Sequence, residues 1–146
     1  MSDIFERVLL LKNLPLFSGV DTEDLRIVAL ALQEETFFKG ERMFDMYDNG
    51  TRMYILTGGK VGVSIHPDPA RREFIVKRGT GECIGEMGIL DNQPRSATIH
   101  VLEDTPTLTL EKAHLQELIV RYPALALGML RSMSQKLREA TARIPG

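Results

Sequence analysis

The sequence has little cysteine and no long apolar run, and each shortage excludes a class of protein. Cys83 is the single cysteine among 146 residues, so an intramolecular disulfide is impossible and we expect a reducing compartment, the cytoplasm. The longest uninterrupted apolar run, from Ile27 to Leu32, has six residues. A membrane span needs about 20. The first residues carry no basic leader, so we expect no secretory signal.

An excess of charge of either sign is also missing. The chain has 18 Lys and Arg against 20 Asp and Glu, a formal net charge of −2. It therefore offers no basic field for nonspecific binding to nucleic acid. Hydrophobic residues at 43% and charged residues at 26% are an ordinary globular mixture. We expect one folded domain over residues 1–146, without direct nucleic-acid or membrane partners.

Both ends of the chain show helical spacing and the middle shows strand spacing. Residues 1–34 are expected to hold two helices, the first capped by Ser2 and the second by Asp21. In residues 35–110, apolar side chains alternate in short runs separated by Gly, Pro, Asn and Asp, which indicates a sandwich or barrel. The expected strands contain Tyr54 and Leu56, Val61 to Ile65, Phe74 to Lys77, Ile99 and Val101, and Leu108 and Leu110.

Residues 111–146 are expected to be helical, with a second helix that starts at Pro123. This helix carries a heptad-like seam of two and a half heptads. The seam consists of Ala126, Leu130, Met133, Leu137, Ala140 and Ile144. Two interpretations remain open: the seam packs the helix on its own barrel, or it pairs two copies of the chain as a homodimer.

Residues 79–98, GTGECIGEMGILDNQPRSAT, combine the groups that a phosphorylated sugar needs. Gly85 and Gly88 let the backbone approach a ligand closely. A single helical turn over residues 86–90 would point unpaired N–H groups at an anion. Arg95 supplies a guanidinium that matches a phosphate, and Ser96 supplies a hydroxyl. The Glu86 carboxylate suits a sugar hydroxyl rather than a phosphate.

This segment resembles the phosphate-binding cassette of the cyclic nucleotide-binding domain family. The matching residues are Ile84-Gly85-Glu86-Met87-Gly88-Ile89-Leu90 and Pro94-Arg95-Ser96-Ala97-Thr98, with Ile84 at a position that is usually aromatic. The resemblance covers essentially the whole chain. Leu14 to Phe17 resembles the approach to the barrel, Gly58 to Val61 a turn into a barrel strand, and Gly81-Glu82 the residues before the cassette.

The resemblance implies a mainly β fold with flanking helices. It would be an eight-stranded jelly-roll barrel (a double-stranded β-helix) over 35–110, with the cassette at 84–98, N-terminal helices at 1–34, and C-terminal helices at 111–146 that end in a lid or dimer helix. No cofactor is implied beyond the ligand itself, cAMP or cGMP. Ser96, where a threonine helps cGMP binding in the family, favours cAMP.

The resemblance also implies a role for each site residue. Glu86 would bind the ribose 2′-hydroxyl, and Arg95 would bind the cyclic phosphate. Backbone groups around Gly85, Met87 and Ser96 would complete the anion site, with Gly88 and Ala97 beside them. Val63 and Val76 are expected under the purine. Arg138 or Thr141 of the last helix is expected to contact the purine from above.

Several alternatives compete with this interpretation. Arg95 could pair with Asp91 or Glu86 as a structural ion pair, and the barrel could have lost its ligand and serve as an interaction or dimerisation module. His66, His100 and His114 are too scattered for a metal centre, so we expect neither a metal nor catalysis. No helix-turn-helix follows the last helix, so we expect either a sensor subunit or a fragment of a larger protein, with an unknown output partner.

Overall fold

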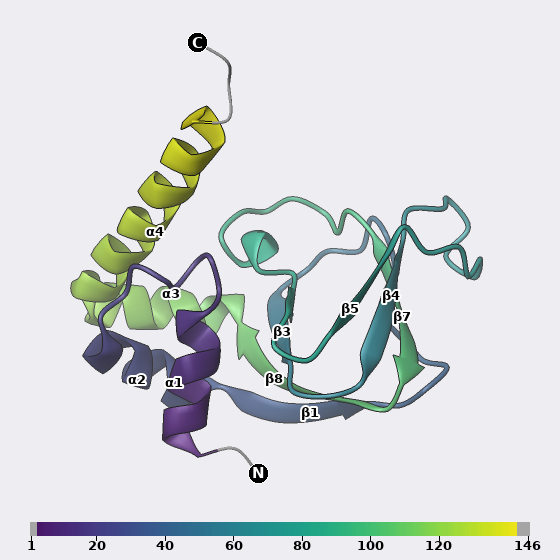
Figure 1. The fold of residues 1–146 in the computed structure, drawn as a ribbon, viewed down its shortest axis with the longest axis horizontal. Coiled ribbons are helices and arrows are strands. Elements are labelled where there is room, and N and C mark those ends of the chain that lie inside the picture. The colour runs from purple at the N-terminus through teal and green to yellow at the C-terminus, as the bar shows by residue number, and fades with distance from the viewer. Residues whose placement is uncertain (1–2, 143–146) are drawn as a thin grey trace. The chain divides into compact units, whose positions relative to one another are not determined.

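The computed structural model describes residues 3–142, apart from the side chain of Met87. The backbone divides into two compact units, each described separately below. A helical unit joins residues 3–31 to residues 113–142, and a β unit spans Leu32–Lys112. Both units can be followed along the chain in Figure 1.

The helical unit contains α1 (Ile4–Lys12), α2 (Thr22–Ala31), α3 (Lys112–Arg121, from its second residue) and α4 (Pro123–Ala142). The cap expected at Ser2 lies outside the described residues. Asp3 is the N-cap instead, because its carboxylate accepts the Glu6 N–H at 2.8 Å. The expected restart at Pro123 is confirmed. Proline suits this position because the first helical N–H has no partner within the helix.

α4 packs within its unit through a different face from the predicted seam. Its buried residues are Leu125, Gly128, Met129 and Ser132. Ser132 Oγ accepts the Gly19 N–H at 2.7 Å, and a Cβ on Gly128 would lie 2.8 Å from Val20 Cα. The close approach of backbone explains the small residues at these positions.

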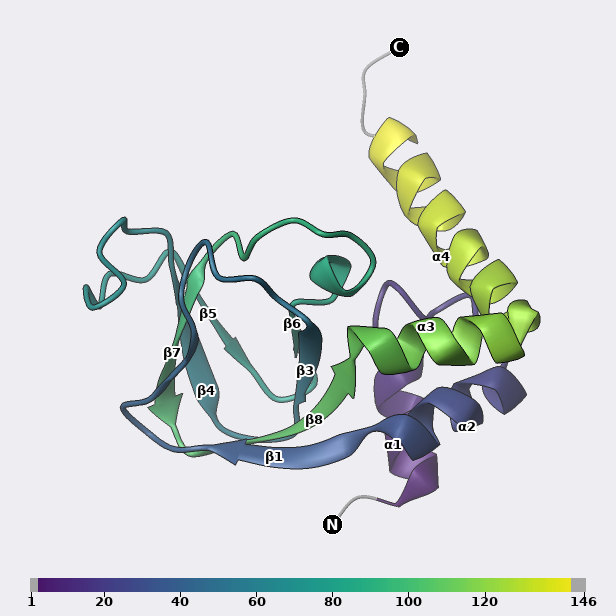
Figure 2. The ribbon, with the colours of Figure 1, turned by 180° about the vertical axis from the view of Figure 1, so that it is seen from behind.

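The predicted seam lies mostly in solvent. Leu130 is 63% exposed and Leu137 is 69% exposed. Figure 2 shows that the C-terminal half of α4 extends beyond α1 and α2 within this unit. The seam is therefore not the packing face of its own unit. Its last member, Ile144, lies outside the described residues.

The β unit contains eight strands in two antiparallel four-stranded sheets. One sheet has the order β1-β8-β3-β6 and the other has the order β2-β7-β4-β5. The bounds are β1 (Gln33–Phe37), β2 (Arg42–Phe44), β3 (Arg52–Leu56), β4 (Lys60–Ser64), β5 (Val76–Gly79), β6 (Cys83–Ile84), β7 (Thr98–Glu103) and β8 (Thr105–Glu111). The mainly β prediction is confirmed, and the strands pair in two four-stranded sheets, while the jelly-roll barrel stays a prediction.

The core of the β unit lies between the two sheets. Tyr54, Leu56 and Ile84 come from one sheet, and Val61 and Ile99 come from the other. These residues belong to the alternating runs that predicted strands, because alternate side chains of a strand share a face. The period-2 pattern therefore selected the buried face correctly.

One predicted strand is displaced along the chain. The run from Phe74 to Lys77 was expected to be extended, but β5 begins only at Val76. Phe74 instead lies on the opposite face of the sheet, where a Cβ on Gly62 would be 2.7 Å from its ring. Its ring centroid is 5.3 Å from that of His100. Phe74 continues the apolar alternation because the loop that carries it packs on the outer face of the sheet.

Candidate functional site

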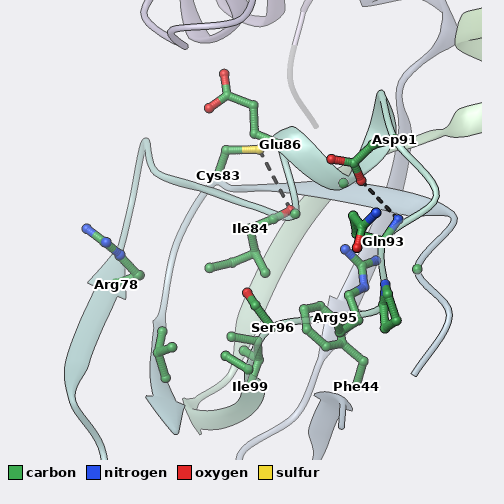
Figure 3. Close-up of a pocket in the computed structure, with 16 residues that line it drawn as sticks. Phe44, Arg78, Cys83, Ile84, Glu86, Asp91, Gln93, Arg95, Ser96 and Ile99 are labelled. Atoms are coloured by element: carbon green, nitrogen blue, oxygen red, sulfur yellow. Dashed lines mark hydrogen bonds between the residues drawn. The ribbon is translucent and has the colours of Figure 1, made fainter. Parts of the chain in front are cut away.

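The β unit holds a cavity of about 410 Å³ lined by the cassette and the inner face of one sheet (Figure 3). Among the residues predicted for the site, those that line it are Val63, Gly85, Glu86, Gly88, Arg95, Ser96 and Ala97. Further lining residues that the sequence did not single out for the site are Phe44, Gly50, Arg78, Cys83, Ile84, Asp91, Gln93, Pro94 and Ile99. The structure therefore gathers most of the predicted cassette around one space.

The cassette begins with a tight turn and a short helix. Gly85 has a φ of +79°, a backbone conformation that favours glycine. The expected single helical turn is the 3₁₀ helix η1 (Met87–Ile89). Ile89 is 2% exposed and fixes this turn to the β unit. Met87 contributes its backbone to this turn.

A lysine holds the far end of the cassette loop. The Lys112 ammonium donates to the Asp91 carbonyl and, at 2.6 Å, to Asn92 Oδ1. The Lys112 N–H donates to the Thr51 carbonyl at 2.7 Å. The loop between η1 and Arg95 is thus attached to the end of β8 by charge-assisted hydrogen bonds.

Arg95 is buried in the β unit beside the cavity, with 8% of the residue exposed. Its Nη2 donates to the Arg52 carbonyl at 2.7 Å, and its guanidinium carbon lies 4.1 Å from the centroid of the Phe44 ring. Its Nε is buried without a hydrogen-bond partner. A Cβ on Gly88 would lie 3.6 Å from Nη1. Because Gly85 and Gly88 have no side chains, the backbone of the cassette lies close to Nη1 of Arg95.

The hydrogen bond that the Arg95 guanidinium makes among the described residues goes to a backbone carbonyl rather than to a carboxylate. The structural ion pair of Arg95 with Asp91 or Glu86 that the sequence also allows stays an alternative. Burial lowers the pKa of the Arg95 guanidinium, and the nearby Tyr54, Asp48 and Cys83 side chains oppose that shift. Guanidinium groups stay protonated in proteins, so this is a buried cation beside a cavity.

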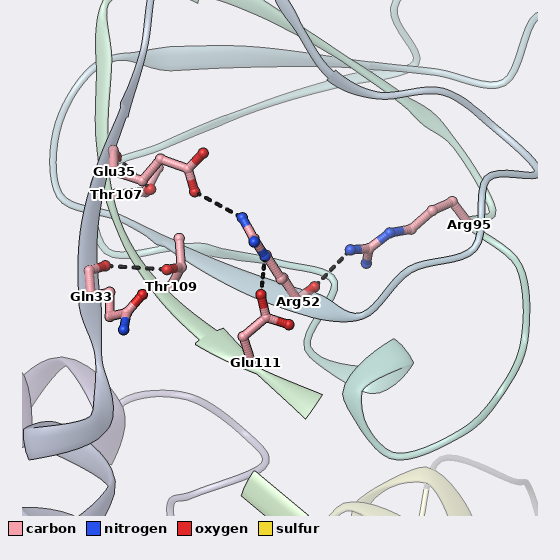
Figure 4. Close-up of polar contacts among 7 residues, drawn as sticks. All are labelled: Gln33, Glu35, Arg52, Arg95, Thr107, Thr109 and Glu111. Atoms are coloured by element: carbon pink, nitrogen blue, oxygen red, sulfur yellow. Dashed lines mark hydrogen bonds and ion pairs between the residues drawn. The ribbon is translucent and has the colours of Figure 1, made fainter. Parts of the chain in front are cut away.

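The Arg52 carbonyl accepts a hydrogen bond from Arg95, and the side chain of Arg52 is itself held by ion pairs. The Arg52 side chain pairs with Glu111 of β8 and, at 3.5 Å, with Glu35 of β1 (Figure 4). The Glu111 hydrogen bond raises the pKa of Arg52, with burial acting against it. Arg52 thus connects three strands of one sheet to the site.

Glu86 lines the same cavity, and in Figure 3 its carboxylate points away from Arg95. This separation suits two different groups of one ligand rather than a mutual ion pair. Cys83 lies next to it, and burial raises the pKa of the thiol well above its usual range. The thiol is therefore protonated and unreactive, as expected for a small buried apolar residue.

The wall opposite the cassette is formed by the inner face of β4, β5 and β7. Val63 lines the cavity, whereas Val76, its cross-strand partner, does not, and the contact of either residue with a purine stays a prediction. Arg78 lines the cavity instead, and it pairs in register with the core residue Val61. Directly opposed residues share a face, so Arg78 leaves β5 on the inner side. Its guanidinium is 3.8 Å from Glu82.

Phe44, Gly50 and Arg52 also lie at the site, and the sequence does not predict them there. Asp48-Asn49-Gly50 was interpreted only as a turn, and Phe44 lies in β2, a strand too short to show alternation. These residues are more than 40 positions from Arg95 in the chain, and no local signal joins them to it. Only a strand-pairing pattern could have brought them together.

The residues that line this cavity lie in a segment that matches a known protein family. Residues 34–122 match the family model described as "Cyclic nucleotide-binding domain". The chain belongs to this family. Its β unit and cassette lie almost wholly within the matched residues.

Individual relatives agree with that assignment. The chain is 31% identical over 130 residues to the cyclic AMP receptor protein of Thermus thermophilus, covering 89% of this chain and 60% of that protein. It is similar to the crystal structure of the N-terminal domain of a transcriptional regulator from Streptomyces coelicolor. That comparison has a TM-score of 0.81 at 30% identity and covers 92% of this chain and 94% of the other.

This cyclic nucleotide-binding domain is shorter than its curated relatives. It covers 30% of a putative potassium channel protein of Rhodopseudomonas palustris, to which it is 31% identical over 131 residues. The chain thus spans between about a third and three fifths of the relatives named here. The family is shared by proteins with different further parts.

Two predicted ligand contacts lie in the helical unit. Arg138 and Thr141 are exposed on α4, and the Thr141 hydroxyl donates to the Leu137 carbonyl at 2.8 Å. Their contact with a ligand stays a prediction. Over residues 3–142, no group of His, Cys, Asp and Glu is arranged to hold a metal, and no helix has the length and apolarity to cross a bilayer.

Proposed function

We propose that this chain is a regulatory sensor domain that binds a cyclic nucleotide in the cavity of its β unit. The observation that carries the proposal is Arg95, a buried guanidinium beside the cavity whose hydrogen bond among the described residues goes to a backbone carbonyl rather than to a carboxylate. A buried charge without a counterion is costly, and an anionic ligand offsets that cost. A cyclic phosphodiester fits because Arg95 offers a planar set of N–H donors.

The other site residues then take distinct roles. Glu86 accepts from the ribose 2′-hydroxyl, and the backbone around Gly85, Met87 and Ser96 donates to the phosphate. Gly88 and Ala97 are small enough to leave the backbone accessible. Val63 contacts the purine. Val76 is the cross-strand partner of Val63 and faces the same side of the sheet, but it does not line the cavity. It contacts the purine only if β5 or the ligand shifts.

We favour cAMP over cGMP as the ligand. Ser96 follows Arg95 where a threonine would help cGMP binding, as the family resemblance implies. The names of two relatives, the cyclic AMP receptor protein of Thermus thermophilus and the CRP-like cAMP-activated global transcriptional regulator of Mycobacterium tuberculosis, support the same choice. The protein is thus a cytoplasmic binding module rather than an enzyme.

The output of the sensor is movement of α4. Ligand binding shifts the helix between positions only by its different affinity for the two states. Arg138 and Thr141 would report the ligand by contacting the purine in one state. The exposed seam of α4 forms a homodimer in this proposal. The downstream partner is a further domain or a separate protein.

The test is calorimetric titration of wild-type protein and Arg95→Ala with cAMP and cGMP. Removing one partner of a buried charge pair costs about 2–5 kcal/mol. We therefore expect the dissociation constant to rise roughly 30-fold to several thousandfold in Arg95→Ala. Arg71→Ala is the matched control, because Arg71 is exposed and pairs with Glu73 at the surface.

Two results would reject the sensor. Equal affinities of wild type and Arg95→Ala would show that Arg95 does not hold the ligand. No heat with either nucleotide, from protein that is folded and dimeric, would favour the alternative, a domain that keeps the fold as an interaction module.

A further inference from the structure

The connection from Phe44 to Arg52, here called the collar, surrounds Arg95. We propose that two residues of the collar, Phe44 and Gly50, are positioning residues that hold the Arg95 guanidinium in place for the ligand phosphate. The inference rests on the proposed function, because it explains how contacts other than an ion pair keep the phosphate-binding arginine in one orientation. It assigns a role to the β2–β3 connection, outside the cassette.

The collar first fixes the backbone of Arg95. The Tyr47 N–H donates to the Arg95 carbonyl at 2.8 Å, and the Arg95 N–H donates to the Asp48 carbonyl at 2.8 Å. Asn49 and Pro94 form an isolated antiparallel bridge beside this pair. Both backbone groups of Arg95 are therefore satisfied by the collar, so its side chain starts from a defined point.

Phe44 then holds the guanidinium. The guanidinium carbon is 4.1 Å from the ring centroid, within the range of a cation–π contact, which strengthens when it is desolvated. Phe44 cannot easily turn away, because its ring lies 6.3 Å from that of Tyr54 and packs on the core cluster. The ring supports the cation without neutralising its charge, as a carboxylate would. Arg95 therefore remains a full positive charge for an anion.

Gly50 leaves the space that the guanidinium occupies. A Cβ at this position would lie 2.8 Å from Arg95 Cδ and closer still to Nε and Cζ. Gly50 does not have a positive φ, so its backbone would accept alanine. The glycine is required by the Arg95 side chain rather than by the turn. This makes Gly50→Ala a substitution that displaces Arg95 selectively.

The experiment is a pair of double-mutant cycles with Arg95→Ala. Gly50→Ala and Phe44→Leu are each made in wild-type protein and in the Arg95→Ala variant. Binding of cAMP is measured by NMR titration, which reaches the millimolar dissociation constants expected without Arg95. Gly79→Ala is the control, because its Cβ would lie 3.7 Å from the Gly59 carbonyl, an ordinary contact.

With Arg95 present, we expect Gly50→Ala and Phe44→Leu each to weaken cAMP binding by about 10-fold, within the range found for residues in contact. With Arg95 already replaced, the same changes should alter affinity less than about twofold. A residue that matters only for the fold, or a Phe44 that touches the ligand itself, would weaken binding equally in both backgrounds. That additive result would overturn the proposal.

A ligand-free measurement separates this inference from the proposed function. A guanidinium over an aromatic face has its Nε–H proton resonance shifted upfield by the ring, so we expect an upfield Arg95 Hε signal. Phe44→Leu should abolish that shift, and Gly50→Ala should move the signal. An Hε signal at its ordinary position in wild type would refute the positioning role. If that signal is shifted but no nucleotide binds, the proposed function fails while the positioning of Arg95 stands.

Discussion

Tyr47 has a φ of 75°, and it is the only described residue other than glycine with a positive φ. A side chain in this left-handed region costs roughly 1–2 kcal/mol. Tyr47 is 73% exposed, so its ring gains little packing in return. The strain lies in the collar, where the Tyr47 N–H holds the Arg95 carbonyl. Strained residues of this kind tend to occur at binding sites.

Comparing Tyr47→Gly with Tyr47→Ala isolates this strain, because both remove the exposed ring. Alanine keeps the penalty and glycine relieves it, at some cost from the flexibility of the unfolded chain. We expect the glycine variant to be more stable than the alanine variant by about 1 kcal/mol in urea denaturation. An alanine variant as stable as the glycine variant would show that the loop carries no strain at this position.

His100 places a titratable group inside the β unit. It is 3% exposed, its Nε2 has no hydrogen-bond partner, and its ring contacts Phe74. Burial lowers the pKa of His100, and the nearby positive charges of Arg72 and Arg42 lower it further. The folded protein therefore favours the neutral imidazole.

The sign of the pH effect follows from that lowered pKa. The unfolded chain takes up its proton near pH 6.5, and the folded chain takes it up only at lower pH. The contribution of His100 to stability is complete well above pH 6.5. It falls as the pH decreases below 6.5, and it levels off below the pKa that His100 has in the folded protein. We expect His100→Gln to reduce this loss between pH 7 and pH 5 in thermal unfolding. An unchanged slope in His100→Gln would contradict this prediction.

At the scale of elements, α4 has one buried face and one exposed apolar face. One face is buried within the helical unit through Leu125, Gly128, Met129 and Ser132, and the heptad-like seam is exposed. A helix with an apolar exposed stripe is suited to pair with a second copy. Spacing alone predicts the seam. The structure shows that the seam is separate from the buried face of α4, and this favours the dimer over packing of the seam within the helical unit.

Leu137→Glu tests the dimer. Burying a leucine from each chain contributes about 1.5–3 kcal/mol per side chain, so a charge there should weaken association by 100-fold or more. Analytical ultracentrifugation should show a dimer for wild type and a monomer for Leu137→Glu. Gln135→Glu adds the same charge on the opposite side of the helix and should remain dimeric. A wild-type monomer at high concentration would contradict the prediction.

The strands differ in how far their sequence predicts them. β4 and β7 were expected from alternation, whereas β1, with sequence QEETF, is too polar to show it. β1 is held by its neighbour: Thr107 Oγ1 donates to the Glu35 carbonyl at 2.7 Å, and Thr109 Oγ1 donates to that of Gln33 at 3.3 Å (Figure 4). Tertiary pairing thus makes a strand where local preference gives little indication of one.

At the scale of the molecule, two segments far apart in sequence form the helical unit and one continuous segment forms the β unit. The spacing of apolar residues predicts a single domain with three regions in chain order. Which helices share a core depends on contacts such as that of Gly19 with Ser132, 113 residues apart. Spacing along the chain carries no information on such contacts.

The sequence by itself determined the period of each segment, the turns that separate the strands, and the cassette with Glu86 and Arg95 at their spacing. These features depend on neighbouring residues, whose chemistry is the same whatever surrounds them. Only the tertiary structure decided what surrounds Arg95. Phe44, Gly50 and the Arg52 carbonyl come from a segment at least 43 residues away, and strand pairing alone brings them to the guanidinium.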